Sequence, residues 1–131
     1  MTTFTLRIPG LPPTTNNAFV NGAHGRHLSS EAKAFKEMVQ WTMLKNRQRF
    51  LSGVDGLVSV TLTFYSEKWF TKAGTPRKID LCNLEKLFVD AVFEQLGMED
   101  SSIFRITMFK LVGPESSVIE IHPMEDLTTS N

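Results

Sequence analysis

Four polar residues near the middle of the chain have types and spacing that suit phosphodiester chemistry: Asp80, Asn83, Lys86 and Asp90. The last three follow one another at intervals of three and four, so they share one face of a helix, and Asp80 stands at the entrance of that helix. Carboxylate oxygens are ligands that Mg²⁺ and Mn²⁺ prefer, and a lysine can offset charge that develops on a phosphate. From spacing alone, the more common explanation of such a row is a solvated helix edge, with Asp80 as a plain N-cap.

A short acidic turn after this helix supplies two further carboxylates, Glu99 and Asp100. The helix is predicted over residues 81–96, and a helix of that length spans roughly 24 Å. Asp80 and Asp100 can therefore meet only if the chain folds back, or across a subunit interface.

A basic segment precedes the same helix. Its cationic residues are Lys68, Lys72, Arg77 and Lys78. We interpret them as contacts to a nucleic-acid backbone, with Trp69 or Phe70 stacking or wedging at an opening in the duplex. The alternative is a solvated loop with one aromatic residue tucked inward. A second group either extends the basic surface or forms a solvated helix face: Arg26, His27, Lys33 and Lys36.

The composition is that of an ordinary globular protein, with 131 residues, of which 41% are hydrophobic and 21% charged. No apolar run approaches the ~18 residues of a membrane span, and from the first residues of the sequence we expect no secretory signal. One cysteine cannot form an internal disulfide, so we expect a cytoplasmic protein. The formal net charge is zero, but 12 of the 14 Lys and Arg residues precede Leu87. This asymmetry fits a phosphate-binding part beside a cation-binding part, or two surfaces that merely differ.

Hydrophobic periodicity predicts an α+β fold: one mixed β-sheet with two packed helices, in the order β-α-β-α-β-β and in a single domain of residues 1–131. The predicted strands are Thr3–Pro9, Leu57–Ser66, Ile103–Val112 and Val118–His122. The first helix is predicted from Ser29 or Ser30 to about Phe50, and the second over Leu81–Leu96 with Gly97 as its stop.

Three finer features are also predicted. Thr14–Arg26 is expected to be a long loop, and the last two strands are expected to form a hairpin. The polar tail of residues 124–131 is expected to fray. The apolar stripe of the first helix is expected to consist of Phe35, Met38, Val39, Thr42 and Met43.

The central segment resembles the motif of the RusA family of Holliday junction resolvases, D-x-D-N-x-x-K-x-x-x-D-A followed by an acidic turn. In this chain it reads Asp80-Leu81-Cys82-Asn83-Leu84-Glu85-Lys86, then Asp90-Ala91 and Asp100. Weaker matches are Pro12-Pro13-Thr14-Thr15-Asn16-Asn17 and Arg26-His27-Leu28-Ser29. The resemblance extends from about Phe4 to Pro123.

This resemblance implies a small homodimeric endonuclease, often encoded by phages, that cuts four-way DNA junctions symmetrically with Mg²⁺ or Mn²⁺. Asp80 and Asp100 would be metal ligands, and Lys86 would be the essential lysine near the scissile phosphate. Lys110 falls where the family has a lysine in the strand after the acidic turn, so it joins the predicted DNA-binding residues.

Two positions depart from the family pattern. Cys82 replaces the second acid of the motif, and a thiol is a poor ligand for Mg²⁺. The acidic turn is Glu99-Asp100 instead of Asp-Asp. Three alternatives follow: Glu99 or Asp90 compensates, one metal ion suffices, or the protein binds junctions without cutting them. A protein-interaction domain is the alternative from another class.

Cys82 also has a simpler interpretation, as a small, half-buried residue in the first turn of the helix. We prefer it to a redox or zinc role, because there is no second cysteine and the three histidines show no ligand spacing.

Overall fold

The strand with the clearest alternation in the sequence, β4 (Val58–Tyr65), lies inside a four-stranded sheet. The computed structural model describes residues 3–22, 25–45, 56–124 and 127. The strand order is β1-β6-β4-β5, with β1 at Phe4–Pro9, β6 at Ser116–Pro123 and β5 at Ile103–Leu111. β5 runs parallel to β4, whereas β6 runs antiparallel to both β4 and β1, so the sheet is mixed as predicted.

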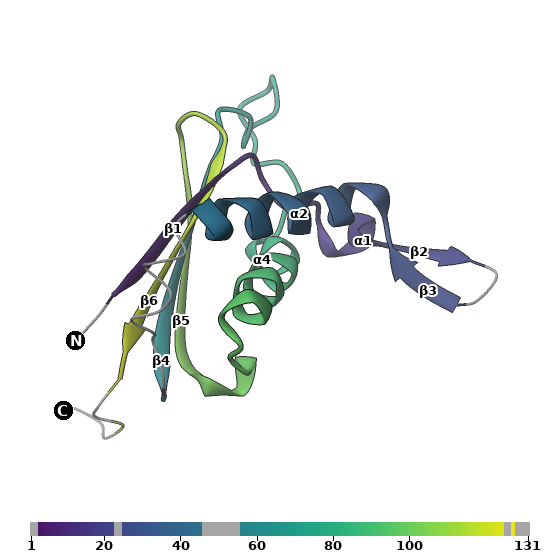
Figure 1. The fold of residues 1–131 in the computed structure, drawn as a ribbon. Coiled ribbons are helices and arrows are strands. Elements are labelled where there is room, and N and C mark those ends of the chain that lie inside the picture. The colour runs from purple at the N-terminus through teal and green to yellow at the C-terminus, as the bar shows by residue number, and fades with distance from the viewer. Residues whose placement is uncertain (1–2, 23–24, 46–55, 125–126, 128–131) are drawn as a thin grey trace.

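Two long helices, α2 (Ser30–Lys45) and α4 (Leu81–Leu96), lie on one side of this sheet (Figure 1). Every second side chain of β4 points toward the core and is buried. Phe88 of α4 lies among them, with its ring centroid 5.8 Å from that of Phe35 and 6.1 Å from that of Phe64. These contacts hold the buried face of α4 against the sheet and fix the position of the residues on its other face. The predicted α+β class with two packed helices is confirmed.

The caps of both helices follow from the sequence. Ser29 Oγ accepts a hydrogen bond from the backbone N–H of Ala32 at 3.2 Å, which starts α2. Gly97 ends α4 in the left-handed conformation (φ 68°), and the N–H of Met98 reaches back to the carbonyl of Phe93 at 3.0 Å. The predicted bounds of the second helix are therefore confirmed. No helix in the described part of the chain is long and apolar enough to cross a membrane.

The stripe of the first helix was only partly predicted. Phe35, Val39 and Met43 are buried, and Ala32 joins them one turn earlier. Met38 is 43% exposed, because the buried row advances by three and four residues and passes beside it. The predicted end of this helix, near Phe50, lies outside the described residues, as does most of the predicted tail.

The prediction of a hairpin between the last two strands was wrong. β4 lies between β5 and β6 and pairs with both. The chain leaves β5 at Leu111, whose carbonyl accepts from the N–H of Ser66 at 3.1 Å, and passes across the end of β4 before β6 begins. β4 carries the most regular apolar row, so the inner position buries it most completely.

The prediction of a long loop over Thr14–Arg26 was also wrong. The segment and the residues just after it contain α1 (Thr15–Ala18), β2 (Phe19–Gly22) and β3 (Gly25–Leu28). β2 and β3 form an antiparallel hairpin that projects away from the body of the molecule (Figure 1). Phe19 and Leu28 at its base pack against the core. These elements of four residues each are too short for periodicity to detect.

Candidate functional site

The candidate site begins at the N-terminus of α4, where Asp80 occupies the N-cap position. Its backbone is extended (φ −79°, ψ 140°), and its carbonyl oxygen accepts from the N–H of Asn83 at 3.0 Å. Its side chain makes no capping hydrogen bond, and the residue is exposed. Asp80 is therefore the N-cap residue by its backbone conformation. Its carboxylate makes no capping hydrogen bond.

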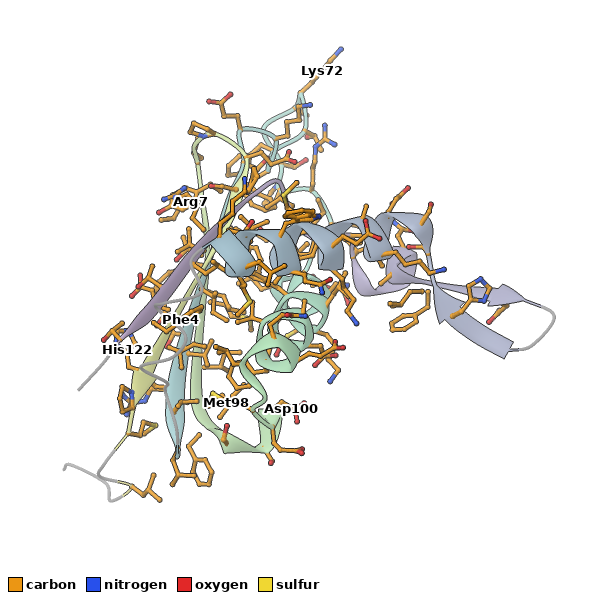
Figure 2. The ribbon with its side chains drawn as sticks, viewed as in Figure 1. Phe4, Arg7, Lys72, Met98, Asp100 and His122 are labelled. Carbon is orange, nitrogen blue, oxygen red and sulfur yellow. The ribbon has the colours of Figure 1, made fainter. Side chains whose placement is uncertain are left out.

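Lys86 connects α4 to the acidic turn. Its Nζ lies 3.4 Å from Oδ1 of Asp90, one turn farther along the helix, and 3.5 Å from Oδ2 of Asp100. Asp100 begins η1 (Asp100–Ser102), which follows the chain reversal at Gly97 (Figure 2). The chain thus folds back within one subunit and brings an acid from beyond the helix to the helix face. Within the described residues, no ion pair includes Asp80.

The two carboxylates keep Lys86 positively charged. The charge of Asp90 is the main cause that raises the pKa of Lys86 above its ordinary value; partial burial opposes this shift, and Asp100 adds to it. All three side chains are about half exposed. Lys86 is therefore a fixed cation at neutral pH, suited to stabilising negative charge and unsuited to acting as a general base.

Glu85 is a member of this cluster that the sequence analysis missed. Burial raises the pKa of the Glu85 carboxyl; Lys86 lowers it, and the charges of Asp90 and Asp100 raise it further. Sequence reasoning passed over Glu85 because neighbours in a helix do not face each other. Because the chain folds back after α4, Asp100 adds a further carboxylate near Glu85 and Asp90. Glu85 therefore belongs to the electrostatics of the site.

The donors present fit a hard divalent cation only in part. Among the described residues, no three His, Cys, Asp or Glu side chains come together as a group that could hold a metal ion. The predicted ligands Asp80, Glu99 and Asp100 are nevertheless all exposed oxygen donors. Mg²⁺ is commonly held by one or two carboxylates, with water and substrate phosphates as its other ligands. An ion held by one or two of these carboxylates would therefore need water and a substrate phosphate to complete its coordination.

Cys82 lies in the first turn of α4 and is exposed. The expectation of a half-buried packing residue was therefore wrong. The buried face of α4 is instead formed by the stripe that begins at Leu84. Because the thiol lies at the surface, an acid at this position would not have to enter the core.

The basic segment between β4 and α4 is a loop whose predicted cations are all exposed. Figure 2 shows Lys72 pointing outward at its far end. Its two aromatic residues have different environments: Trp69 is buried and donates from Nε1 to the carbonyl of Leu111 at 2.8 Å, whereas Phe70 is 55% exposed. Lys110 lies over the Trp69 ring, with Nζ 5.3 Å from the ring centroid. Trp69 thus anchors the loop to β5 and leaves Phe70 at the surface.

The second group of predicted cations is less uniform. The Arg26 side chain lies outside the described residues. His27 and Lys33 line an open cavity beside Glu31, and Lys36 pairs with Glu94 at 2.9 Å. In this group, His27 and Lys33 are exposed, whereas Lys36 is half-buried and paired with an acid.

A second cavity, of about 300 Å³, lies directly beside the lysine cluster. Its apolar lining comes mainly from the base of the β2–β3 hairpin and from α4, and Lys86 and Asp90 line it as well. The base of the hairpin therefore forms one wall of the site, which the loop prediction did not foresee.

Comparison with known proteins identifies the family of the chain. The family model described as endodeoxyribonuclease RusA matches residues 9–122 of the chain. A comparison with curated proteins gives no significant match. The family match begins at Pro9, the last residue of β1, and ends at His122 in β6. It includes the whole lysine cluster, and the chain belongs to the endodeoxyribonuclease RusA family.

Proposed function

We propose that the protein is a Holliday junction resolvase that cuts branched DNA in a reaction dependent on Mg²⁺ or Mn²⁺. The single observation that carries this proposal is the position of Lys86, whose ammonium is shared by Asp90 and Asp100. The family membership supports an endonuclease that acts on DNA junctions. The cluster supplies what such a reaction requires, a fixed cation beside exposed carboxylates.

The roles in the reaction follow from the side chains. Asp80 and Asp100 would hold the divalent ion, with Glu99 as a further candidate ligand. When bound, such an ion polarises the phosphoryl oxygen and lowers the pKa of a water molecule. Lys86 offsets the charge that develops on the phosphate, and Asp90 keeps the ammonium in place from one turn away.

The basic loop provides the contact to DNA outside the reacting phosphate. Lys68, Lys72, Arg77 and Lys78 are exposed and would neutralise backbone phosphates without reading sequence. Phe70 is the exposed aromatic ring of the loop and would stack on a base where the junction opens. A C2 homodimer would present two such sites to the two equivalent cleavage positions of a four-way junction.

Cleavage of a synthetic four-way junction tests this function. We expect cutting with Mg²⁺ or Mn²⁺, its loss in Asp80→Asn, and a ~10²–10³-fold lower rate in Lys86→Ala. Glu37→Gln and Lys45→Ala change exposed residues of α2 outside the site and serve as matched controls. Failure to prefer the junction over linear duplex at the same salt concentration would refute junction recognition.

The second candidate function is junction binding without cleavage. The exposed thiol of Cys82 favours it, because it stands where the family motif has an acid. Tight, structure-selective binding with no cutting under any metal would identify this function.

A further inference from the structure

The cavity beside the lysine cluster has apolar walls. Its volume, about 300 Å³, is that of a small ligand pocket. The apolar side chains that line it are Ala18, Phe19, Leu28 and Leu87. Ala18 and Leu87 are buried, whereas Phe19 and Leu28, which pair across the base of the β2–β3 hairpin, are half-buried. The hairpin (Figure 1) therefore presents one aromatic ring and one aliphatic side chain to a ligand in this cavity.

Three charged side chains complete the lining of the cavity: Lys36 of α2, and Lys86 and Asp90 of α4. All three are in ion pairs. Lys36 pairs with Glu94 at 2.9 Å, and Lys86 pairs with Asp90 at 3.4 Å. The cavity therefore offers hydrogen-bond donors and acceptors with little net charge, whereas a cavity that stays empty in a protein core is lined by apolar groups alone. Such a lining fits an uncharged ligand with apolar faces and polar edges.

We propose that this cavity receives one unstacked base of the DNA, from the nucleotide next to the scissile phosphate. This inference rests on the proposed function and adds a base-binding subsite to it. A nucleobase is uncharged, stacks its faces on aromatic and apolar side chains, and carries donors and acceptors on its edges. Lys86 belongs both to the phosphate site and to the cavity, so a nucleotide whose phosphate lies at Lys86 has its base beside the ring of Phe19. Phe70 does not line the cavity and contacts a different base.

A base held in this cavity fixes the position of the cut strand relative to Lys86. Unstacking a base costs least where the duplex is already interrupted, so the cavity favours a phosphate at the branch point over one inside a continuous duplex. The carboxylate of Asp90 can accept a hydrogen bond from an exocyclic amino group, and the ammonium of Lys36 can donate one to a base carbonyl. The subsite thus couples recognition of the junction to the choice of the phosphate that is cut.

An abasic scan tests the subsite. Junctions with one abasic site at each nucleotide around the branch point are titrated with the full chain in metal-free buffer. At one position we expect the loss of the base to weaken binding roughly 5- to 150-fold, as the loss of base stacking does. Phe19→Leu removes the aromatic ring and keeps an apolar side chain, so this abasic penalty should shrink by about 2-fold or more. Phe104→Leu makes the same change at an exposed residue of β5 that does not line the cavity, and the penalty should stay.

Leu28→Phe provides a second variant in case Phe19→Leu folds poorly. It adds apolar volume to the lining and should reduce the abasic penalty in the same way. Equal penalties in the wild type and both variants overturn the subsite, whether or not the protein cuts junctions.

A crystal soaked with deoxyadenosine 5′-monophosphate gives a readout that depends neither on cutting nor on junction binding. We expect the base in the cavity, against Phe19, and the phosphate at Lys86. A base bound there in a protein that cuts no junction supports the subsite and refutes the proposed activity. If the protein does not bind junctions, the proposed function fails, and a soaked crystal with an empty cavity overturns the subsite as well.

Discussion

Lys86 holds its position through charge and contributes little to stability. Its pairs with Asp90 and Asp100 are longer than 3.3 Å and are about half exposed. Ion pairs at such positions contribute ~0–1 kcal/mol to folding. A cluster that adds so little to stability, and that crowds carboxylates around one cation, is better explained by function than by folding.

Cys82 is the position at which the two candidate functions, cutting and binding alone, can be tested. Its exposed position allows Cys82→Asp to add a carboxylate near Asp80 without burying a charge. We expect this variant to raise the cleavage rate or the affinity for Mg²⁺, measured by junction cleavage over a metal titration. Cys82→Ser, which adds no charge, is the control. Equal rates for Cys82→Asp and the wild type would show that the second acid of the family motif is dispensable here.

Glu85 makes stability depend on pH. Its folded-state pKa lies above the ordinary value of 4.5, chiefly because of burial, so the folded state holds a proton that the unfolded state has already released. Stability therefore falls as the pH rises through the window just above 4.5, and the loss persists at neutral pH. We expect Glu85→Gln to raise the melting temperature at neutral pH in metal-free buffer and to leave it unchanged below pH 4.5. Glu37→Gln should have no effect at either pH; an equal gain for Glu85→Gln on both sides of the window would contradict this account.

At the scale of elements, α4 has two functions. Its buried stripe from Leu84 to Phe93 packs into the core, and its opposite face carries Lys86 and Asp90. The basic loop before it is anchored separately, by the hydrogen bond from Trp69 to Leu111. The rigid anchor and the exposed ring next to it in sequence make the loop suitable for inserting Phe70 into a junction.

Phe70→Ala tests the loop. We expect a roughly 5- to 150-fold loss of junction affinity, equivalent to ~1–3 kcal/mol of base stacking, with little change in melting temperature. The comparison variant Trp41→Ala removes an exposed aromatic residue from α2 and should bind junctions normally. Gel-shift titration with junction and linear duplex measures both. An affinity loss that is the same for linear duplex would show that Phe70 contributes to general binding and not to recognition of the junction.

At the scale of the whole molecule, the charge asymmetry of the sequence has only a partial counterpart in space. The exposed cations of the basic loop lie at one end of α4, whereas Asp100 lies past its other end, close to the side chain of Lys86 (Figure 2). Lys36, by contrast, is paired with Glu94. These two ion pairs thus each join a lysine from the basic part of the sequence to a carboxylate from the acidic part.

The sequence by itself determined the elements and the residue types of the site. The bounds of α4, its stop at Gly97 and the alternation of β4 follow from local periodicity and backbone preference, which act over a few residues. Only the tertiary structure decided that β4 lies between β5 and β6. It also decided that the base of the β2–β3 hairpin lines the cavity beside Lys86, and that Asp100 lies close enough to pair with Lys86. These arrangements join segments distant in the chain and depend on which packing buries the most apolar surface, so no local pattern encodes them.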